Sequence, residues 1–341
     1  MTGTKAWIAG CSGLRLTDDE RAFFQDERPW GFILFGRNIG EAAQVWDLVA
    51  ELKSLGGSSR RPVLIDQEGG RVQRLRPPLS PRFPPSASIG QVFAADPVKG
   101  RRAAWLQGRL LAHDLLVGYG IDVDCLPCLD VPQPGAHSVI GDRAYAEDPA
   151  LVAELGGLAA EGLMAGAVLP VMKHIPGHGR GEADSHLELP QVSAERAALE
   201  GFDFRPFKSL ADLPAAMTAH LLFESLDPVR PATLSPVVIG EIIRKAIGFD
   251  GLLMSDDMSM KALQGDMGEL AGRAIAAGCD LALHCNGDMA EMQLVAANVP
   301  ELAGRSLARA ERALQITRQQ PEPIDEPALR EEFHSLFSAS T

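Results

Sequence analysis

The sequence predicts a single (β/α)8 barrel, an α/β fold in which eight parallel strands alternate with helices. Three observations support this prediction. The 341-residue chain has an ordinary globular composition, with 46% hydrophobic and 23% charged residues. Eight short apolar segments recur along it, and helix-like segments separate many of them. The alternative is a doubly wound open sheet. That fold usually has a glycine-rich phosphate turn after its first strand, and Cys11-Ser-Gly-Leu14 does not fit one.

The predicted strands are almost uninterruptedly apolar, as expected for parallel strands that are covered on both faces. They are residues 7–10, 31–35, 63–66, 123–127, 168–173, 216–220, 252–255 and 281–284. The segments with helical character are residues 41–55, 94–117, 149–165, 194–211, 236–247 and 260–278. Asp148 and Ser235, each followed by proline, predict helix starts, and Gly278 predicts a helix end. We expect residues 1–317 to form the barrel and residues 318–341 to form a tail with a short helix at 326–337.

The charge balance argues against a nucleic-acid partner. The chain has 45 acidic residues and 32 lysines and arginines, a net charge of −13, whereas nucleic-acid binding draws on clustered cations. No apolar stretch approaches the roughly 20 residues that span a bilayer. Cys11 ends a segment that resembles a lipoprotein cleavage box, but the apolar run before it is shorter than a signal segment of about 7–15 residues. We therefore expect a cytoplasmic protein, monomeric by default, with no membrane partner.

The five cysteines do not indicate a disulfide framework, because their number is odd and they are scattered along the chain. Cys125 and Cys128 form a C-x-x-C pair within a strand-like segment, where their spacing places them on opposite faces. No second pair completes a zinc site. The sequence thus predicts neither a structural metal nor a redox centre, and no cofactor.

Polar side chains follow six of the predicted strands at their carboxyl ends, where barrel enzymes carry their chemistry. They are Asp66 to Arg74 after the third strand, Asp130 and Arg143 after the fourth, Lys173, His174 and His178 after the fifth, and His220, Asp256 with Asp257, and His284 after the last three. A lone aspartate at a strand end is more often structural than functional. Six polar strand ends in register favour an active site.

The types of these residues favour retaining glycoside hydrolysis, in which a carboxylate attacks the sugar and a second group moves the proton. Asp256, at the end of a buried strand, suits a fixed nucleophile, while strand alternation should turn Asp257 away. Asp184 can orient His186 from two residues away, so that this pair replaces the usual second carboxylic acid. Sugar hydroxyl or amide oxygens would be held by Arg74, Arg143, Lys173 and His174.

Four spaced motifs also resemble those of one enzyme family. They are Ile65-Asp-Gln-Glu-Gly-Gly-Arg-Val-Gln-Arg74, Val139-Ile-Gly-Asp-Arg143, Lys173-His-Ile-Pro-Gly-His-Gly179 with Asp184-Ser-His186, and Ser255-Asp-Asp-Met-Ser-Met260. In this order they resemble the bacterial cytoplasmic β-N-acetylhexosaminidases of glycoside hydrolase family 3, the NagZ type used in cell-wall recycling. The resemblance covers about residues 7–316.

The resemblance implies a β-N-acetylglucosaminidase that removes terminal N-acetylglucosamine from muropeptides of the GlcNAc-1,6-anhydro-MurNAc-peptide type. By it, Asp256 is the nucleophile, His186 the acid/base and Asp184 the partner of His186. The residues implied to bind the sugar are Asp66, Arg74, Arg143, Lys173 and His174. The sequence departs from the family pattern at Gln67, where many members have histidine, and at Ile175, which replaces phenylalanine.

Chain length separates the sequence from the longer β-glucosidases of the same family, in which a second domain supplies the acid. Here the barrel uses most of the chain, so the acid/base must come from the barrel itself.

Two other functions remain open. One is a metal-dependent hydrolase with zinc among His174, His178, His186 and Asp256, although these residues lack a compact ligand spacing. The other is a sugar-binding protein without catalysis, which an intact Asp256, Asp184 and His186 make less plausible.

Overall fold

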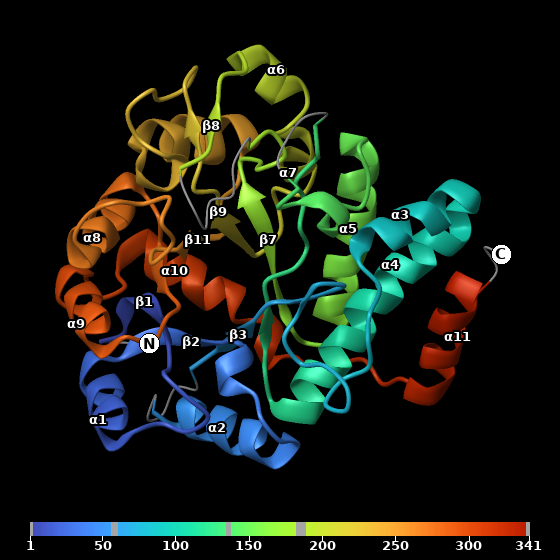
Figure 1. The fold of residues 1–341 in the computed structure, drawn as a ribbon, viewed down its shortest axis with the longest axis horizontal. Coiled ribbons are helices and arrows are strands. Elements are labelled where there is room, and N and C mark those ends of the chain that lie inside the picture. The colour runs from blue at the N-terminus through green and yellow to red at the C-terminus, as the bar shows by residue number, and fades with distance from the viewer. Residues whose placement is uncertain (1–2, 56–60, 134–137, 182–188, 339–341) are drawn as a thin grey trace.

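The computed structural model describes residues 3–55, 61–133, 138–181 and 189–338, and a closed barrel of eight parallel strands lies at its centre (Figure 1). Around the barrel the strand order is β1, β12, β11, β9, β7, β6, β3 and β2. The bounds of these strands are β1 Lys5–Gly10, β2 Pro29–Leu34, β3 Val63–Ile65, β6 Val123–Asp124, β7 Leu169–Ile175, β9 Ala215–Thr218, β11 Leu252–Asp257 and β12 Leu281–His284. The predicted (β/α)8 barrel is confirmed, and the open-sheet alternative is wrong.

The barrel interior is a packed apolar core that ends where the polar residues begin. Side chains of alternate strand positions fill it, among them Leu64, Leu169, Val171, Leu252 and Met254. Because alternate residues of a strand point to the same side, the next inward positions are Asp66, Lys173 and Asp256. The alternation that builds the core therefore brings these three side chains to one mouth of the barrel.

Helices surround the barrel as an outer layer (Figure 1). They are α1 Asp18–Glu27, α2 Ala42–Ser54, α3 Ser86–Ala95, α4 Pro97–Ala112, α5 Pro149–Ala165, α6 Arg196–Gly201, α7 Arg205–Ser209, α8 Met267–Ala277, α9 Met289–Asn298, α10 Gly304–Ala313 and α11 Glu326–Ser338. The start of α5 is as predicted, since Asp148 Oδ1 accepts hydrogen bonds from the backbone N–H groups of Ala150 and Leu151, at 2.8 and 2.9 Å. Within the described ranges no helix is long and apolar enough to cross a bilayer.

Several predicted helices differ from those observed. Residues 94–117 form parts of α3 and α4 and a π-helical turn, because Asp96 caps α4 and ends α3. Residues 194–211 form two short helices, α6 and α7, and Val238–Ile247 is π-helical. Helix α1 was not predicted, although Thr17 and Glu20 form a capping box at its start.

Two short pairs of strands lie outside the barrel, one antiparallel and one parallel. The pair β4 (Gln67–Gly69) and β5 (Val72–Gln73) is a hairpin directly after β3, and β8 (Gln191–Val192) pairs with β10 (Leu222–Phe223). The hairpin turn needs glycine, because Gly69 has a φ of 100° and a Cβ there would collide with the carbonyl oxygen of Pro84. This turn carries the chain from Asp66 back to Arg74.

The C-terminal helix α11 packs against α4 on the outside of the barrel (Figure 1). Arg102 of α4 donates two hydrogen bonds to Glu332 of α11, at 2.7 and 2.8 Å. Arg330 forms an ion pair with Asp114, and Phe333 lies against Phe83 with ring centroids 5.9 Å apart. The last helix is therefore anchored by both polar and apolar contacts.

Candidate functional site

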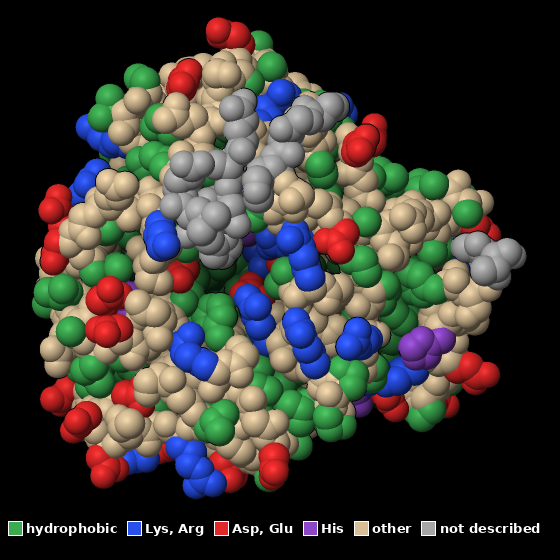
Figure 2. Space-filling model, in the orientation of Figure 1, with side chains coloured by type: hydrophobic (Ala, Val, Ile, Leu, Met, Phe, Trp, Pro, Cys, Tyr) green, Lys and Arg blue, Asp and Glu red, His purple; other side chains and the backbone are tan. Residues whose placement is uncertain are grey.

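A cleft of about 350 Å³ opens at the carboxyl ends of the barrel strands. Figure 2 shows Lys and Arg side chains gathered around a hollow in the middle of this face. The cleft brings together the predicted site residues that lie in the described part of the chain, namely Asp66, Arg74, Arg143, Lys173, His174 and Asp256. The other two, Asp184 and His186, lie outside the described residues.

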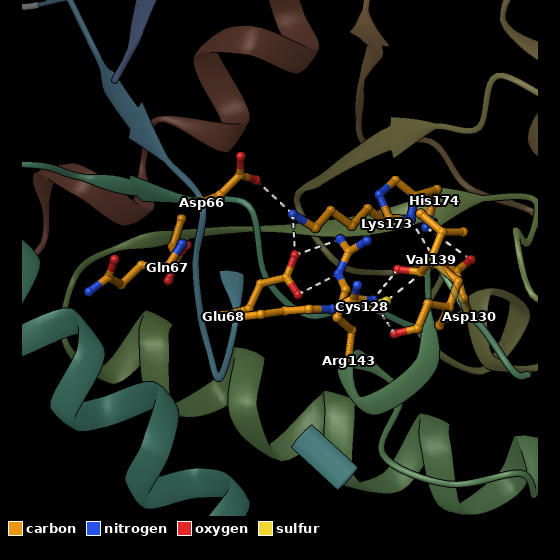
Figure 3. A network of polar contacts seen from close by, with 12 residues as sticks. Asp66, Gln67, Glu68, Cys128, Asp130, Val139, Arg143, Lys173 and His174 are labelled. Carbon is orange, nitrogen blue, oxygen red and sulfur yellow. Dashed lines mark hydrogen bonds and ion pairs between the residues drawn. The ribbon is translucent and has the colours of Figure 1, made fainter. Parts of the chain in front are cut away.

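Two carboxylates and two cations form a network at the cleft (Figure 3). Asp66, Arg143 and Lys173 line the cleft, and the buried Glu68 joins them without lining it. Lys173 Nζ lies 2.7 Å from both Asp66 Oδ1 and Glu68 Oε1. Arg143 donates a bidentate pair of hydrogen bonds to Glu68, from Nε at 2.8 Å and from Nη2 at 2.7 Å. We call these four residues the ion-pair floor. Because their formal charges cancel, the ion-pair floor can be buried without an excess charge.

The charges of the ion-pair floor hold one another ionised. Burial alone would raise the pKa of Glu68, but Arg143 and Lys173 outweigh it and lower that pKa to about 2. The pKa of Asp66 likewise falls well below its usual range, since Lys173 and Arg74 oppose the effect of burial. Burial would lower the pKa of Lys173, but the two carboxylates raise it above its ordinary value. The ammonium group therefore stays charged at neutral pH.

Arg74 extends this network toward the mouth of the cleft. Its Nη2 donates a hydrogen bond to Asp66 Oδ2 at 3.0 Å, so Asp66 is shared between Arg74 and Lys173. Its guanidinium also lies over the ring of Phe35, 5.2 Å from the centroid. These contacts hold the Arg74 side chain in place where it lines the cleft.

His174 is oriented by a second buried carboxylate. Its Nδ1 donates to Asp130 Oδ2 at 2.6 Å, and Asp130 Oδ1 accepts the backbone N–H of His178 at 2.6 Å. The Cys128 thiol also donates to Asp130 Oδ2, at 3.3 Å. A carboxylate that holds one imidazole nitrogen fixes the ring orientation and tautomer. His174, held in this way, lines the cleft.

One group of side chains in the described part of the chain has ligand atoms close enough to hold a metal ion. It consists of Cys128, Asp130 and His174, whose ligand atoms lie within 4.8 Å of one another. Hydrogen bonds among these three residues already use those atoms. The group differs from the predicted zinc alternative, which would place the ion among histidines and Asp256.

Asp256 and Asp257 both line the cleft, so the expectation that only one of them would face it is wrong. The strand register shifts between Met254 and Asp257, which breaks the simple alternation. The two carboxylates nevertheless differ. Asp257 accepts hydrogen bonds from the backbone and hydroxyl of Ser259 and from the backbone of Cys285, at 3.0, 2.7 and 3.1 Å. Asp257 therefore holds the loop after β11 in place.

Asp256, by contrast, accepts one hydrogen bond from the described residues, from the backbone N–H of Asp257 to Oδ1 at 2.8 Å. Its side chain remains partly exposed in the cleft. Burial raises the pKa of Asp256, but the nearby His220 and His174 outweigh that effect, so the net pKa lies below its usual value. An ionised carboxylate with an oxygen open to the cleft has the properties that a nucleophile needs.

The remaining two polar strand ends do not reach the cleft. His220 Nε2 donates to the backbone carbonyl of Asp257 at 3.0 Å, and its Nδ1 lies 2.8 Å from Thr233 Oγ1. His220 thus stabilises the end of β11 through a hydrogen bond to its backbone. His284 pairs with Glu291 of α9 at 2.9 Å and does not line the cleft, contrary to the expectation that all six strand ends converge.

Glu68 belongs to the site but was not among its predicted residues. It lies within the motif that begins at Asp66, directly before the two glycines, and it is 2% exposed. The signal that could have identified Glu68 is its position in the same short motif as Asp66. Sequence spacing did not reveal its partner, because Arg143 lies 75 residues further along the chain.

Replacing Glu68 with glutamine is expected to lower the free energy of unfolding by about 3–5 kcal/mol at neutral pH, the cost of removing one partner from a buried ion pair. The pKa of Glu68 is about 2, below its ordinary 4.5, so its charge stabilises the fold fully above pH 4.5. This contribution is lost as the pH falls toward 2. Urea unfolding should therefore show the free energies of unfolding of the unchanged protein and of Glu68→Gln converging as the pH falls from 4.5 toward 2.

The matched control for this change is Glu269→Gln. Glu269 is 68% exposed and lies 3.8 Å from Arg273 on the same helix. Such a surface pair contributes little, so the control should change the unfolding free energy by less than about 1 kcal/mol. Equal stability of Glu68→Gln and the unchanged protein at neutral pH would contradict a structural role for the ion-pair floor.

Comparisons with known proteins give matches over most of the chain. A family model described as the glycosyl hydrolase family 3 N-terminal domain matches residues 7–316. A β-hexosaminidase of Alkalilimnicola ehrlichii is 40% identical over 286 residues, covering 82% of this chain and 80% of the relative. A β-hexosaminidase of Aromatoleum aromaticum is 36% identical over 333 residues, covering 96% and 90%.

A solved structure is also similar over nearly the whole chain. It is NagZ from Neisseria gonorrhoeae in complex with N-trifluoroacetyl-D-glucosamine, which superposes with a TM-score of 0.87 at 30% identity and 98% coverage of each chain. The likeness therefore extends over the barrel and the segments that surround it.

Proposed function

Since the chain belongs to glycosyl hydrolase family 3, we propose that it is a retaining β-N-acetylglucosaminidase that acts on muropeptides. The chain is a glycoside hydrolase of the β-hexosaminidase type. The proposed substrates are GlcNAc-1,6-anhydro-MurNAc-peptides, from which it would release the terminal N-acetylglucosamine in the cytoplasm during peptidoglycan recycling. The observation that carries the proposal is that Asp256 shares one cleft with four charged residues, namely Asp66, Arg74, Arg143 and Lys173.

In the first step of the proposed reaction, a carboxylate oxygen of Asp256 attacks C1 of the bound sugar. The bond between C1 and the glycosidic oxygen breaks, and that oxygen takes a proton from His186, which Asp184 orients. The sugar is now an ester of Asp256, and the aglycone leaves as an alcohol. The low pKa of Asp256 favours the attack, because the group is ionised at neutral pH.

In the second step, water replaces the aglycone. His186 accepts a proton from the water molecule, whose oxygen attacks C1 and breaks the ester bond to Asp256. Two displacements at C1 restore the original anomeric configuration. The acetamido group of the substrate is not required as a nucleophile in this scheme, since Asp256 occupies that role.

The proposed place of the sugar follows from the donors and acceptors around the cleft. Asp66 can accept hydrogen bonds from sugar hydroxyls, and Arg74 and Arg143 can donate to them or to the acetamido oxygen. Lys173 and His174 add two further polar groups to the lining of the same cleft. A relative, NagZ from Neisseria gonorrhoeae, binds an N-acylated glucosamine, which supports the choice of sugar.

Replacing Arg143 with lysine is expected to weaken binding of N-acetylglucosamine by about 1–3 kcal/mol, the scale of a lost hydrogen bond to a charged group. Lysine cannot reproduce the bidentate contact with Glu68, so the whole ion-pair floor would shift. Calorimetry with the free sugar measures the effect, and the exposed Arg305→Lys serves as control. Unchanged affinity would remove Arg143 from the binding site.

The proposed substrate is tested directly by incubating the protein with GlcNAc-1,6-anhydro-MurNAc-peptides and identifying the products by mass spectrometry. Free N-acetylglucosamine and the intact 1,6-anhydro-MurNAc-peptide are expected in equal amounts. The Asp256→Ala variant is the control for contaminating activity. Turnover of an aryl N-acetylglucosaminide without release from muropeptides would mean that the natural aglycone is a different one.

A further inference from the structure

A second hollow, of about 460 Å³, adjoins the cleft. Arg71 lines both spaces, so the two lie beside each other at this residue. The second hollow is also lined by Arg76, Arg82, Phe83 and Asp142, and we call it the arginine hollow. None of these residues was assigned a catalytic or sugar-binding role, and the proposed chemistry uses none of them.

The arginine hollow carries a local excess of positive charge. Its three arginines are all exposed, and Asp142 is the one acidic residue among those that line it. The protein as a whole has a net charge of −13, so this patch opposes the overall balance. Figure 2 shows basic side chains grouped beside the central hollow. Such a concave surface with guanidinium groups favours an anionic ligand.

Two of the guanidinium groups are held in place by backbone carbonyls. Arg71 donates from Nη2 to the carbonyl oxygens of Ser138 and Ile140, at 3.0 and 3.2 Å, and Arg76 Nε donates to that of Gln73 at 2.9 Å. Neutral acceptors orient an arginine without cancelling its charge. A ligand therefore meets pre-positioned cations and loses less side-chain entropy than flexible arginines would require.

The ion pair of Arg71 with Asp142 does not neutralise the hollow. Its atoms are 3.3 Å apart, and the two side chains are 49% and 48% exposed. A pair that is so exposed is weak, because water screens it. Arg76 and Arg82 have no carboxylate partner among the described residues. Their charges remain available to a ligand.

We propose that the arginine hollow is a subsite that binds a carboxylate of the aglycone. This inference rests on the proposed function. If the terminal sugar occupies the cleft, the aglycone attached to it must extend out of the mouth of the cleft. The arginine hollow adjoins the cleft at Arg71, so it lies where the aglycone can reach it. A planar guanidinium matches a carboxylate in a two-point contact, and Phe83 offers an apolar wall to the carbon chain that bears it.

The experiment compares two muropeptides that differ only in this charge. One is a GlcNAc-1,6-anhydro-MurNAc-peptide with free carboxylates on its peptide, and the other carries the same carboxyl groups as methyl amides. We expect the unchanged protein to prefer the free acid in kcat/KM. Arg82→Gln should lower kcat/KM for the acid by about three- to tenfold, the scale of a partly exposed charged hydrogen bond. Turnover of the amide and of an uncharged aryl N-acetylglucosaminide should stay unchanged.

Arg76→Gln is a second variant with the same expected pattern, in case Arg82→Gln folds poorly. The matched control is Arg305→Gln, which removes the same charge from an exposed site on α10. Added salt should reduce the preference for the acid, since the contact is electrostatic. No preference in the unchanged protein, or equal losses on acid and amide, would overturn the subsite while release of GlcNAc leaves the proposed function standing. Cleavage of the aryl glycoside alone would overturn both.

Discussion

Replacing Asp256 with alanine is expected to reduce turnover by on the order of 10⁴-fold or more, the scale for removal of a nucleophile. The loss should be equally severe for a natural disaccharide and for an activated aryl glycoside, because both need the same attack on C1. Steady-state release of N-acetylglucosamine measures the effect. Circular dichroism and thermal unfolding establish that the variant keeps its fold.

A trapped intermediate identifies the attacking oxygen. A 2-fluoro sugar with a good leaving group should form a stable ester, and peptide mass analysis should locate it on Asp256. The control is Asp257→Asn, which keeps a side-chain acceptor for Ser259 and Cys285 and should still form the adduct. Labelling of Asp257 alone, or no adduct, would mean that the nucleophile has been wrongly assigned.

Replacing His186 with alanine should have an effect that depends on the leaving group. A general acid contributes about 10²–10⁴-fold, so turnover of a muropeptide or chitooligosaccharide should fall by that factor. A nitrophenolate departs readily as an anion, so the first step with a nitrophenyl glycoside should be much less impaired. The ratio of kcat/KM for the two substrates is the measurement.

Azide provides a second test of the same residue. It is an anionic nucleophile that needs no base, so it should accelerate breakdown of the Asp256 ester in the His186→Ala variant with an aryl substrate. The product should be a glycosyl azide of unchanged anomeric configuration. His334→Ala, at an exposed position of α11, is the control and should show no azide effect. Equal losses on both substrates without azide rescue would give His186 a structural or binding role.

Much of the barrel was predictable because its signals are local. Eight apolar segments gave the strand count, and the polar residues at their carboxyl ends included Asp66, Lys173 and Asp256, which line the cleft. Helix boundaries were harder to predict where a polar residue fits both a helix interior and a helix cap. Asp96 before Pro97 could stand inside one long helix or between two, and its hydrogen bonds to Val98 and Lys99 show that it caps α4.

The contacts within the site were less predictable because they join distant parts of the chain. The motif around Glu68 indicated function, but nothing in its sequence indicated that Glu68 would bind both Lys173 and Arg143. The orientation of His284 toward Glu291 likewise depends on how α9 packs beside β12. The roles of His186 and Asp184 stay predictions.

The pairing of β1 with β12 has a consequence for synthesis of the chain. Trp7 lies opposite Ala282 in the barrel register, so the barrel strand that is synthesised first pairs with the one that is synthesised last. Until residues 281–284 emerge, β1 keeps an unpaired edge and the barrel stays open. Exposed strand edges invite association with other chains. The nascent chain therefore keeps an open barrel with an exposed strand edge, a state prone to association, until β12 has emerged.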